Sequence, residues 1–143
     1  MTWRFRFPRS VIVSFNRCLE GKRSAYDKGV QAEKLAARFL ERQGFEVIEM
    51  RYKTSFGEVD IVAYDPNEDL LTFVEVKARS DYREGIEAIS FRSRRRIEKA
   101  ALSFISNHEA YWDSSMRFDA VIISERKGDI LIDHLDNAWM SGQ

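Results

Sequence analysis

Apolar and polar residues along this chain follow helical spacing in two segments and strand-like patterns in five others. The helical pattern covers residues 24–43, with Gly44 in the position of a helix-stopping glycine, and a second helical stripe covers residues 90–107. Runs rich in Val, Ile, Leu and Phe predict strands, and turn-forming residues bound most of them. These strands are expected at residues 45–52, 58–64, 70–79, 118–124 and 130–135.

The order of these segments is helix, three strands, helix and two strands, α-β-β-β-α-β-β. It predicts one α/β domain at residues 24–143, with a mixed central sheet flanked by helices. Residues 65–69 have the composition of a turn and join the second and third strands into a hairpin, whereas residues 80–87 are expected to form a polar loop. Residues 1–23 show no clean period and are predicted to be an appended arm, helical in part.

Charged residues stand inside two strands that otherwise have the composition of buried strands. Glu58 and Asp60 lie in the second strand, and Glu75 and Lys77 lie in the third. Strand interiors are poor in such residues, and an unpaired buried charge is costly. Side chains alternate between the faces of a strand, so Asp60, Glu75 and Lys77 converge if the hairpin aligns these faces. A buried ion-pair network is the alternative interpretation.

Two convergent carboxylates form a hard, oxygen-rich site suited to Mg²⁺ or Mn²⁺. Asp60 and Glu75 are the candidate ligands, and the backbone carbonyl of Val76 is a further one. Lys77 can position a water molecule and offset charge on an anionic substrate, so metal and lysine together suit hydrolysis of a phosphodiester. Glu33, which borders the inward face of the first helix, is a candidate for a second metal or a metal-bound water. A solvated helix edge is the alternative for Glu33.

Four segments of the chain resemble the YraN family of bacterial proteins. They are GEVDIV at residues 57–62, FVEVKAR at 73–79, RFD at 117–119 and NA at 137–138. That family is assigned to the PD-(D/E)XK nuclease superfamily, which has a restriction-endonuclease-like fold, and is similar to archaeal Holliday junction resolvases. The resemblance covers residues 25–140, and it says nothing about the arm that precedes them.

The resemblance implies a Mg²⁺-dependent endodeoxyribonuclease that acts on branched DNA, and a homodimer by analogy with junction resolvases. It implies metal binding by Asp60 and Glu75, a catalytic role for Lys77 and support from Glu33. Glu58 belongs to the same motif, and its separation of about 7 Å along the strand from Asp60 places it at the edge of the site.

A basic run follows at the start of the second helix. Ser93 stands inside this run, where the family usually carries a lysine, and Arg51 stands where the family often shows asparagine. The alternative to phosphate contact is a solvated helix face for the arginines of this run, and an exposed loop position without a binding role for Arg79. The candidate nucleic-acid-binding residues are Arg79, Arg92, Arg94, Arg95 and Arg96.

Total charge hides an uneven distribution. Residues 1–23 contain six basic side chains and one acidic one, so their net charge of +5 balances −5 in the rest of the chain. A basic arm is compatible with a polyanionic partner. Cys18 is the only cysteine and favours a reducing compartment, and no apolar run is long enough to span a bilayer. A cytoplasmic protein without membrane insertion is therefore expected.

Two other functions fit the same sequence. The first is a non-catalytic nucleic-acid-binding module, whose basic helix and arm provide the affinity. The second is a protein-interaction subunit of a larger machinery, because exposed aromatic residues often mark a partner surface. The aromatic residues of the arm are Trp3, Phe5, Phe7 and Phe15.

Two residues near the C-terminus receive structural interpretations. Asp119 stands in a strand and is expected to pair with a basic side chain. His134 is expected to be structural, because no second histidine or cysteine accompanies it at metal-ligand spacing.

Overall fold

The computed structural model describes residues 9–13 and 25–142 of the chain. The strands of this described part form one sheet in the order β1-β6-β5-β4-β3-β2, in which β4 and β5 are parallel and all other neighbours are antiparallel. The predicted mixed α/β architecture is therefore confirmed. The elements are β1 (Arg9–Val13), α1 (Ala25–Arg42), β2 (Glu46–Lys53), β3 (Glu58–Asp65), β4 (Leu70–Ala78), α2 (Tyr82–Glu87), α3 (Phe91–Asn107), η1 (Glu109–Tyr111), β5 (Ser115–Arg126) and β6 (Asp129–Trp139).

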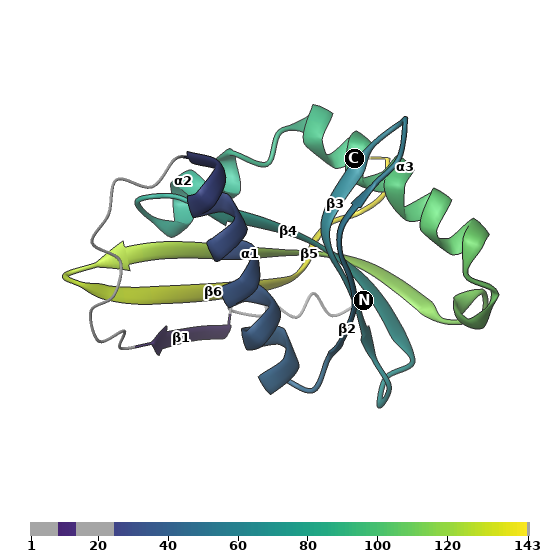
Figure 1. The fold of residues 1–143 in the computed structure, drawn as a ribbon, viewed down its shortest axis with the longest axis horizontal. Coiled ribbons are helices and arrows are strands. Elements are labelled where there is room, and N and C mark those ends of the chain that lie inside the picture. Colours follow the sequence, from purple (N-terminus) through teal and green to yellow (C-terminus); the bar gives the residue numbers. More distant parts are fainter. Residues whose placement is uncertain (1–8, 14–24, 143) are drawn as a thin grey trace, which may run out of the picture.

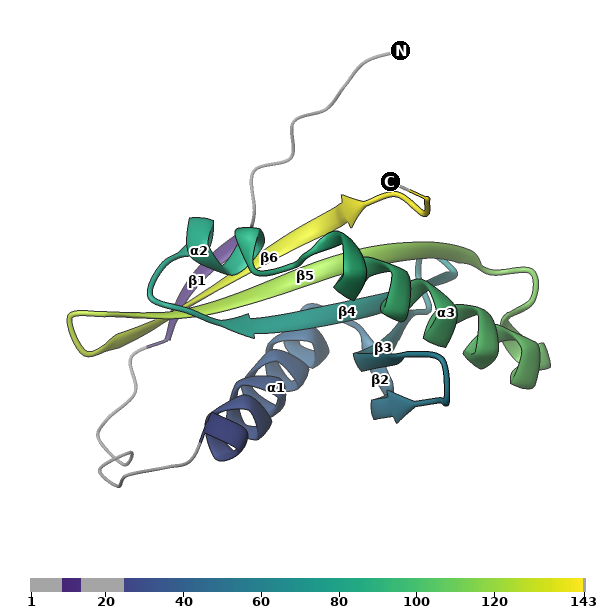
Figure 2. The ribbon, with the colours of Figure 1, turned by 90° about the horizontal axis from the view of Figure 1, so that it is seen from above.

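Helices cover both faces of the sheet (Figures 1 and 2). Leu40 of α1 belongs to one hydrophobic core with Val74, whereas Phe104 of α3 belongs to a second core with Phe73. Phe73 and Val74 are neighbours on β4, so strand alternation sends them to opposite faces. β4 is therefore buried on both sides, which explains why it has the most apolar sequence of the strands.

Local signals set the helix ends much as predicted. α1 ends at Arg42, and Gly44 follows with a left-handed φ of +97°. The hydroxyl of Ser90 accepts a hydrogen bond from the Ser93 N–H at 3.1 Å and so caps α3. No helix within residues 9–13 and 25–142 is both long and apolar enough to cross a membrane.

The predicted polar loop at residues 80–87 is wrong, because most of it forms the short helix α2. Asp81 caps this helix by accepting a hydrogen bond from the Glu84 N–H at 2.8 Å. Gly85 is buried against β5, where an added Cβ would lie 2.4 Å from the Cγ2 atom of Ile122. A helix this short is marginal alone, so its packing against β5 stabilises it.

Part of the predicted arm belongs to the sheet. Residues 9–13 form β1 rather than a helical segment, and β1 pairs with β6 from Arg9↔His134 to Val13↔Ile130. The Ser10 hydroxyl donates a hydrogen bond to the buried carboxylate of Asp133. The rest of the predicted arm, residues 1–8 and 14–23, lies outside the described residues.

Both C-terminal strands are longer than predicted. The turn between β5 and β6 consists of Lys127 and Gly128, whose φ angles of +52° and +83° suit a two-residue hairpin turn. The register shifts between Phe118 and Ala120, so β6 continues past a bulge as far as Trp139. The bulge places Asp119 in a fully buried position.

Candidate functional site

The site is built where β3 and β4 separate. The two strands pair from Asp65↔Leu70 to Ile61↔Val74. In the continuation of that register Asp60 faces Glu75. The Oδ2 atom of Asp60 accepts a hydrogen bond from the backbone N–H of Val76 at 2.8 Å. The side chain of Asp60 therefore satisfies the Val76 N–H at a point where the main chain of β3 no longer pairs with β4.

Glu75 and Lys77 lie on the same face of β4 as Phe73, the face covered by α2 and α3. The Nζ atom of Lys77 is 3.0 Å from the Oε1 atom of Glu75. Only 8% of Glu75 is exposed, and the Lys77 side chain is 21% exposed. The lysine thus keeps its charged end at the edge of solvent while it pairs with a buried carboxylate.

Asp60 is the residue whose charge is most affected by these surroundings. Burial and the neighbouring carboxylate of Glu75 raise the pKa of Asp60 from 3.8 to about 8, and Glu33 adds to the rise; the Val76 hydrogen bond opposes it. Two carboxylates at this separation do not both ionise without cost. At neutral pH Asp60 therefore favours its protonated form, or a cation in place of the proton. Such perturbed carboxyl groups gather at functional sites.

Glu33 reaches the same region from α1. Arg51 of β2 donates from Nε to the Oε2 atom of Glu33 at 2.6 Å and from Nη2 to Oε1 at 3.4 Å. Arg51 has a positive φ of +54°, which departs from regular strand geometry at this point. This pairing was not predicted, since Arg51 was noted only as a departure from the family pattern. The Arg51 guanidinium offsets the charge of Glu33, the third carboxylate in the surroundings of Asp60.

A small cavity of about 80 Å³ connects Glu33, Asp60 and Glu58. Its volume exceeds the share of one water molecule in the liquid, so it has room for a water or a small ion. Glu58 lies at the exposed side of this cavity, and its Oε2 atom is 4.0 Å from both Lys53 and Arg96. The structure therefore gathers Glu33, Asp60, Glu75 and Lys77, with Glu58 at the margin.

The candidate phosphate-binding arginines differ from one another. Arg92, Arg95 and Arg96 are exposed on α3. Arg94 instead stacks its guanidinium over the ring of Trp139, 5.9 Å from the ring centroid, and its Nε is buried. Arg79 is exposed after β4 and donates a hydrogen bond to the Ala78 carbonyl at 2.8 Å. Packing therefore holds Arg94 against the protein, whereas the other four arginines are exposed residues.

A second ionic cluster lies at the bulge of β5 and β6. Arg117 donates two hydrogen bonds to Asp119, at 2.7 and 2.8 Å, and the Nε2 atom of His134 is 2.9 Å from the same carboxylate. Burial acts in the opposite direction, but the hydrogen bonds from His134 and Arg117 hold the pKa of Asp119 below its ordinary value. The predicted pairing of Asp119 with a basic side chain is confirmed.

The same cluster has the composition of a metal site. Ligand atoms of Asp119, His134 and Asp136 lie within 4.8 Å of one another, so this group could in principle hold a metal ion. However, Arg117 already occupies both oxygens of Asp119 and lies 3.6 Å from Asp136. A guanidinium cation in this place offsets the charge that a metal would otherwise balance.

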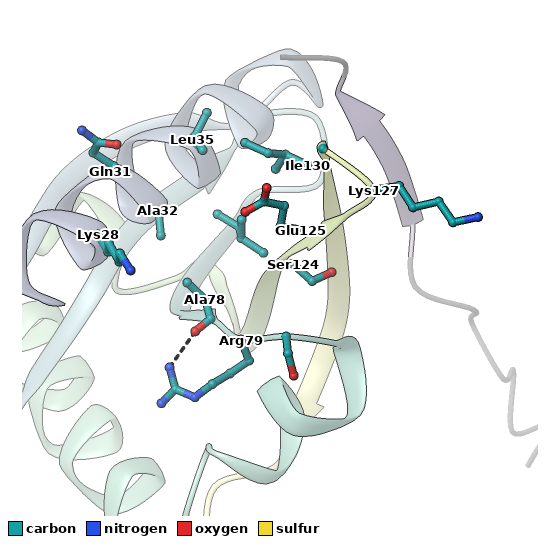
Figure 3. A pocket seen from close by; sticks show the side chains of 13 residues that line it. Lys28, Gln31, Ala32, Leu35, Ala78, Arg79, Ser124, Glu125, Lys127 and Ile130 are labelled. Atoms are coloured by element: carbon teal, nitrogen blue, oxygen red, sulfur yellow. Dashed lines mark hydrogen bonds between the residues drawn. The ribbon is translucent and has the colours of Figure 1, made fainter. Parts of the chain in front are cut away.

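A larger cavity of about 830 Å³ lies between α1 and the ends of β4, β5 and β6 (Figure 3). It includes Ala32 and Ala78, the direct neighbours of Glu33 and Lys77 in the chain. Lys28 of α1 faces the cavity, whereas the side chain of Lys127 points away from it (Figure 3). The lining of the cavity thus combines apolar side chains such as Leu35 and Ile130 with the basic Lys28 and the acidic Glu125.

Comparison with known proteins assigns the chain to a family. The sequence profile described as "Uncharacterised protein family UPF0102" matches residues 32–123. The chain belongs to this family. A UPF0102 protein of Azorhizobium caulinodans is 40% identical over 118 residues, which cover 82% of this chain and 86% of the relative. UPF0102 proteins of Mesorhizobium japonicum and Bartonella tribocorum are 40% and 43% identical, over 82% and 71% of this chain and 90% and 77% of theirs.

The UPF0102 profile includes the whole carboxylate site. Glu33, Asp60, Glu75 and Lys77 all fall inside residues 32–123, as does α3. The edge strand β1 and the strand β6 fall outside it. The family segment therefore contains the four side chains of the carboxylate site, together with the second part of α1 and the central strands that position them.

Proposed function

We propose that this UPF0102 protein is a divalent-metal-dependent deoxyribonuclease that hydrolyses phosphodiester bonds in branched DNA. The observation that carries the proposal is the pair of Asp60 and Glu75 beside the amino group of Lys77. This arrangement agrees with the PD-(D/E)XK resemblance of the sequence, and the proposal includes the restriction-endonuclease-like fold of that superfamily. We further propose a cytoplasmic homodimer, because symmetric cleavage of a branched substrate needs two sites.

The carboxylate pair fits a hard divalent cation. Asp60 and Glu75 face each other where the hairpin strands separate, and burial, together with the Glu75 carboxylate, raises the pKa of Asp60 to about 8. A cation between them would relieve the repulsion that a proton otherwise relieves. Asp60 and Glu75 would hold Mg²⁺ or Mn²⁺, with the Val76 carbonyl as a proposed further ligand. The bound ion would supply positive charge near the phosphate and acidity to a water molecule.

The chain's own groups supply orientation and charge. The Val76 N–H fixes Asp60, and the ion pair with Glu75 fixes the amino group of Lys77. Lys77 offers three N–H donors, enough to keep its ion pair while it binds a phosphate oxygen or a water molecule. Arg51 balances Glu33, which lowers the net negative charge that an incoming phosphate would meet.

Basic side chains near the site support a nucleic-acid substrate. Arg79 follows Lys77 by two residues, and Arg96 lies 4.0 Å from Glu58 at the margin of the site. Arg92 and Arg95 are exposed on the same helix as Arg96. Lysine and arginine contacts to phosphates provide most of the sequence-independent affinity for nucleic acids. These four arginines are the proposed phosphate contacts.

The test is cleavage of labelled four-way-junction and duplex DNA by the purified full chain in Mg²⁺ or Mn²⁺. We expect Asp60→Asn and Glu75→Gln to abolish cleavage, and Lys77→Met to slow it by about 10²–10⁴-fold. Glu46→Gln on the exposed start of β2 is the matched control and should leave the rate unchanged. Equal rates for Asp60→Asn and the wild type would reject the proposal. Salt-dependent DNA binding without metal-stimulated cleavage would favour the non-catalytic module instead.

A further inference from the structure

The turn between β2 and β3 presents an aromatic side chain to solvent. Phe56 in this turn is 72% exposed, the largest value among the large hydrophobic side chains of the described residues. Single exposed apolar residues are common on protein surfaces and need no explanation by themselves. Phe56 differs from such residues in how its backbone is held and in what surrounds it.

The backbone of this turn is fixed by Thr54. The Oγ1 atom of Thr54 accepts hydrogen bonds from the N–H groups of Phe56 and Gly57, at 3.1 and 3.0 Å. The N–H of Thr54 donates to the Gly57 carbonyl at 2.8 Å. These bonds close the turn on itself, so Phe56 stands on a preorganised support rather than on an open loop.

The turn also rests directly on α3. A Cβ added to Gly57 would lie 1.9 Å from the backbone carbonyl oxygen of Arg96, so only glycine permits this approach. Both ribbon views place the tip of the β2–β3 hairpin beside α3 (Figures 1 and 2). This contact fixes the position of Phe56 relative to the basic first half of the helix.

Two cationic side chains lie at the base of the turn. Lys53 directly precedes the turn at the end of β2, Arg96 lies on α3 where Gly57 contacts it, and each is 4.0 Å from the same oxygen of Glu58. Their side chains are 66% and 51% exposed, so each can reach a ligand from solvent if it exchanges its long contact with Glu58 for a phosphate. Proteins that bind single-stranded nucleic acid combine exposed aromatic rings, which stack on the bases, with cationic side chains that contact the phosphates.

Phe56 is close to the carboxylate site. It precedes Asp60 by four residues, which span at most about 13 Å of extended strand. A nucleotide advances about 3.4 Å along one strand of a duplex, so a base on Phe56 would lie within about four nucleotides of a phosphate held at Asp60. The ring is therefore in range to contact the strand that the site would hold.

We propose that Phe56 stacks on an unpaired base of single-stranded DNA, while Lys53 and Arg96 contact the adjoining phosphates. This surface, made of Lys53, Phe56 and Arg96, favours DNA with an unpaired segment over continuous duplex. The inference rests on the proposed function only for the position of cleavage, since the stacking itself is a property of binding. It assigns substrate preference to a residue outside the carboxylate site.

The experiment measures binding separately from cleavage. Full-length wild-type protein is titrated in EDTA against fluorescently labelled oligo(dT) and against a duplex of the same length, with anisotropy as the readout. We expect tighter binding to oligo(dT), and we expect Phe56→Ala to weaken it about five- to a hundredfold, the loss of one aromatic–base stack. Binding to duplex should change less than about twofold.

Two further variants make the outcome specific. Phe56→Trp keeps a stacking ring and should retain binding to oligo(dT). Trp112→Ala removes another exposed aromatic residue, 59% exposed beyond the far end of α3, and should have no effect. Unchanged oligo(dT) affinity of Phe56→Ala, or a wild type that does not prefer oligo(dT), overturns the inference whatever the cleavage result. If Phe56→Ala loses oligo(dT) binding and the wild type cleaves no DNA, the stacking inference is supported and the proposed nuclease activity is rejected.

Discussion

Asp60 faces Glu75 at the first position beyond the last paired residues of β3 and β4, Ile61 and Val74. Continued pairing at this point would bring two like charges together across neighbouring strands, which is unfavourable. Instead the strands part, and the Asp60 carboxylate binds the Val76 N–H in the opening. The same two residues therefore end the ladder and create the site.

Affinity for divalent metal should depend on pH through Asp60. A metal must displace the proton from a carboxyl group whose pKa is about 8. Below that value, the apparent dissociation constant for Mn²⁺ should rise up to about tenfold per pH unit, and it should level off above it. Calorimetric titration between pH 6 and 9 measures this slope and the accompanying proton release. A pH-independent constant, or a slope retained by Asp60→Asn, would contradict the assignment.

Without metal, the raised pKa of Asp60 makes the protein less stable as pH increases. The unfolded chain ionises Asp60 near pH 3.8 and the folded chain only near pH 8, so the free energy of unfolding falls between these values. Asp60→Asn keeps an acceptor for Val76 and removes the ionisation. We expect this variant to match the wild type in Tm near pH 4 and to exceed it by a few degrees at pH 8. Thermal unfolding in EDTA is the measurement, and a constant difference across this range would contradict it.

The close contact of Gly57 with α3 predicts a strong effect of a single methyl group. In Gly57→Ala the new Cβ would clash with the Arg96 carbonyl oxygen, and backbone atoms cannot move aside cheaply. We expect a loss of about 1–3 kcal/mol in the free energy of unfolding, measured in urea. Gly29→Ala is the matched control, because a Cβ there meets nothing within 4 Å and Ala favours the helix. Equal effects of the two substitutions would show that the contact does not constrain the turn.

The buried cluster at Asp119 should depend on Arg117. Arg117→Met leaves the fully buried carboxylate without its bidentate partner and should cost about 3–5 kcal/mol at neutral pH. The lowered pKa of Asp119 stabilises the fold at any pH above the ordinary pKa of an aspartate. This contribution to stability disappears as the pH falls through the pKa that Asp119 has in the folded protein. The effect of Arg117→Met should therefore shrink in acid. Urea unfolding at pH 7 and pH 3 tests this, with Arg126→Met at the exposed end of β5 as the control.

A second experiment on this cluster tests metal binding. If Zn²⁺ raises the Tm of the wild type but not that of Asp136→Asn, the group holds a metal and Arg117 is not its sufficient counter-ion. We expect no such shift, because the guanidinium already satisfies Asp119. His134 combines its hydrogen bond to Asp119 with packing, since its ring lies edge-on to Phe39 and Phe45.

Much of the fold was predictable because periodicity reports burial. The stripe of α1 and its glycine stop depend on neighbours in sequence, and the structure confirms them. The Ser90 cap of α3 depends on an equally local contact. The short helix α2 was not predictable in the same way, since the contact of Gly85 with Ile122 depends on a strand 37 positions away. β1 likewise exists as a partner of β6 rather than through its own pattern.

The candidate site also contains features that local sequence predicted and features that depend on contacts between distant segments. Alternation along two strands was enough to bring Asp60 and Glu75 together and to pair Glu75 with Lys77. Arg51 was missed as the partner of Glu33, because the contact depends on a positive φ in β2 and on the docking of α1. Arg94 was grouped with its neighbours in the basic run, since nothing local announces that Trp139 packs against it.

β1 has a consequence for how the protein is handled. It covers the outer edge of β6, and Ser10 is the donor that Asp133 uses inside the sheet. Removal of the first 23 residues would expose a row of unpaired backbone groups along Ile130–His134. It would also leave the buried carboxylate of Asp133 without the hydrogen bond from Ser10. An open strand edge of this kind recruits further strands, so the shortened protein should form aggregates in which other chains replace β1. Loss of solubility after truncation would then report an uncovered edge, even if residues 1–23 bind no partner.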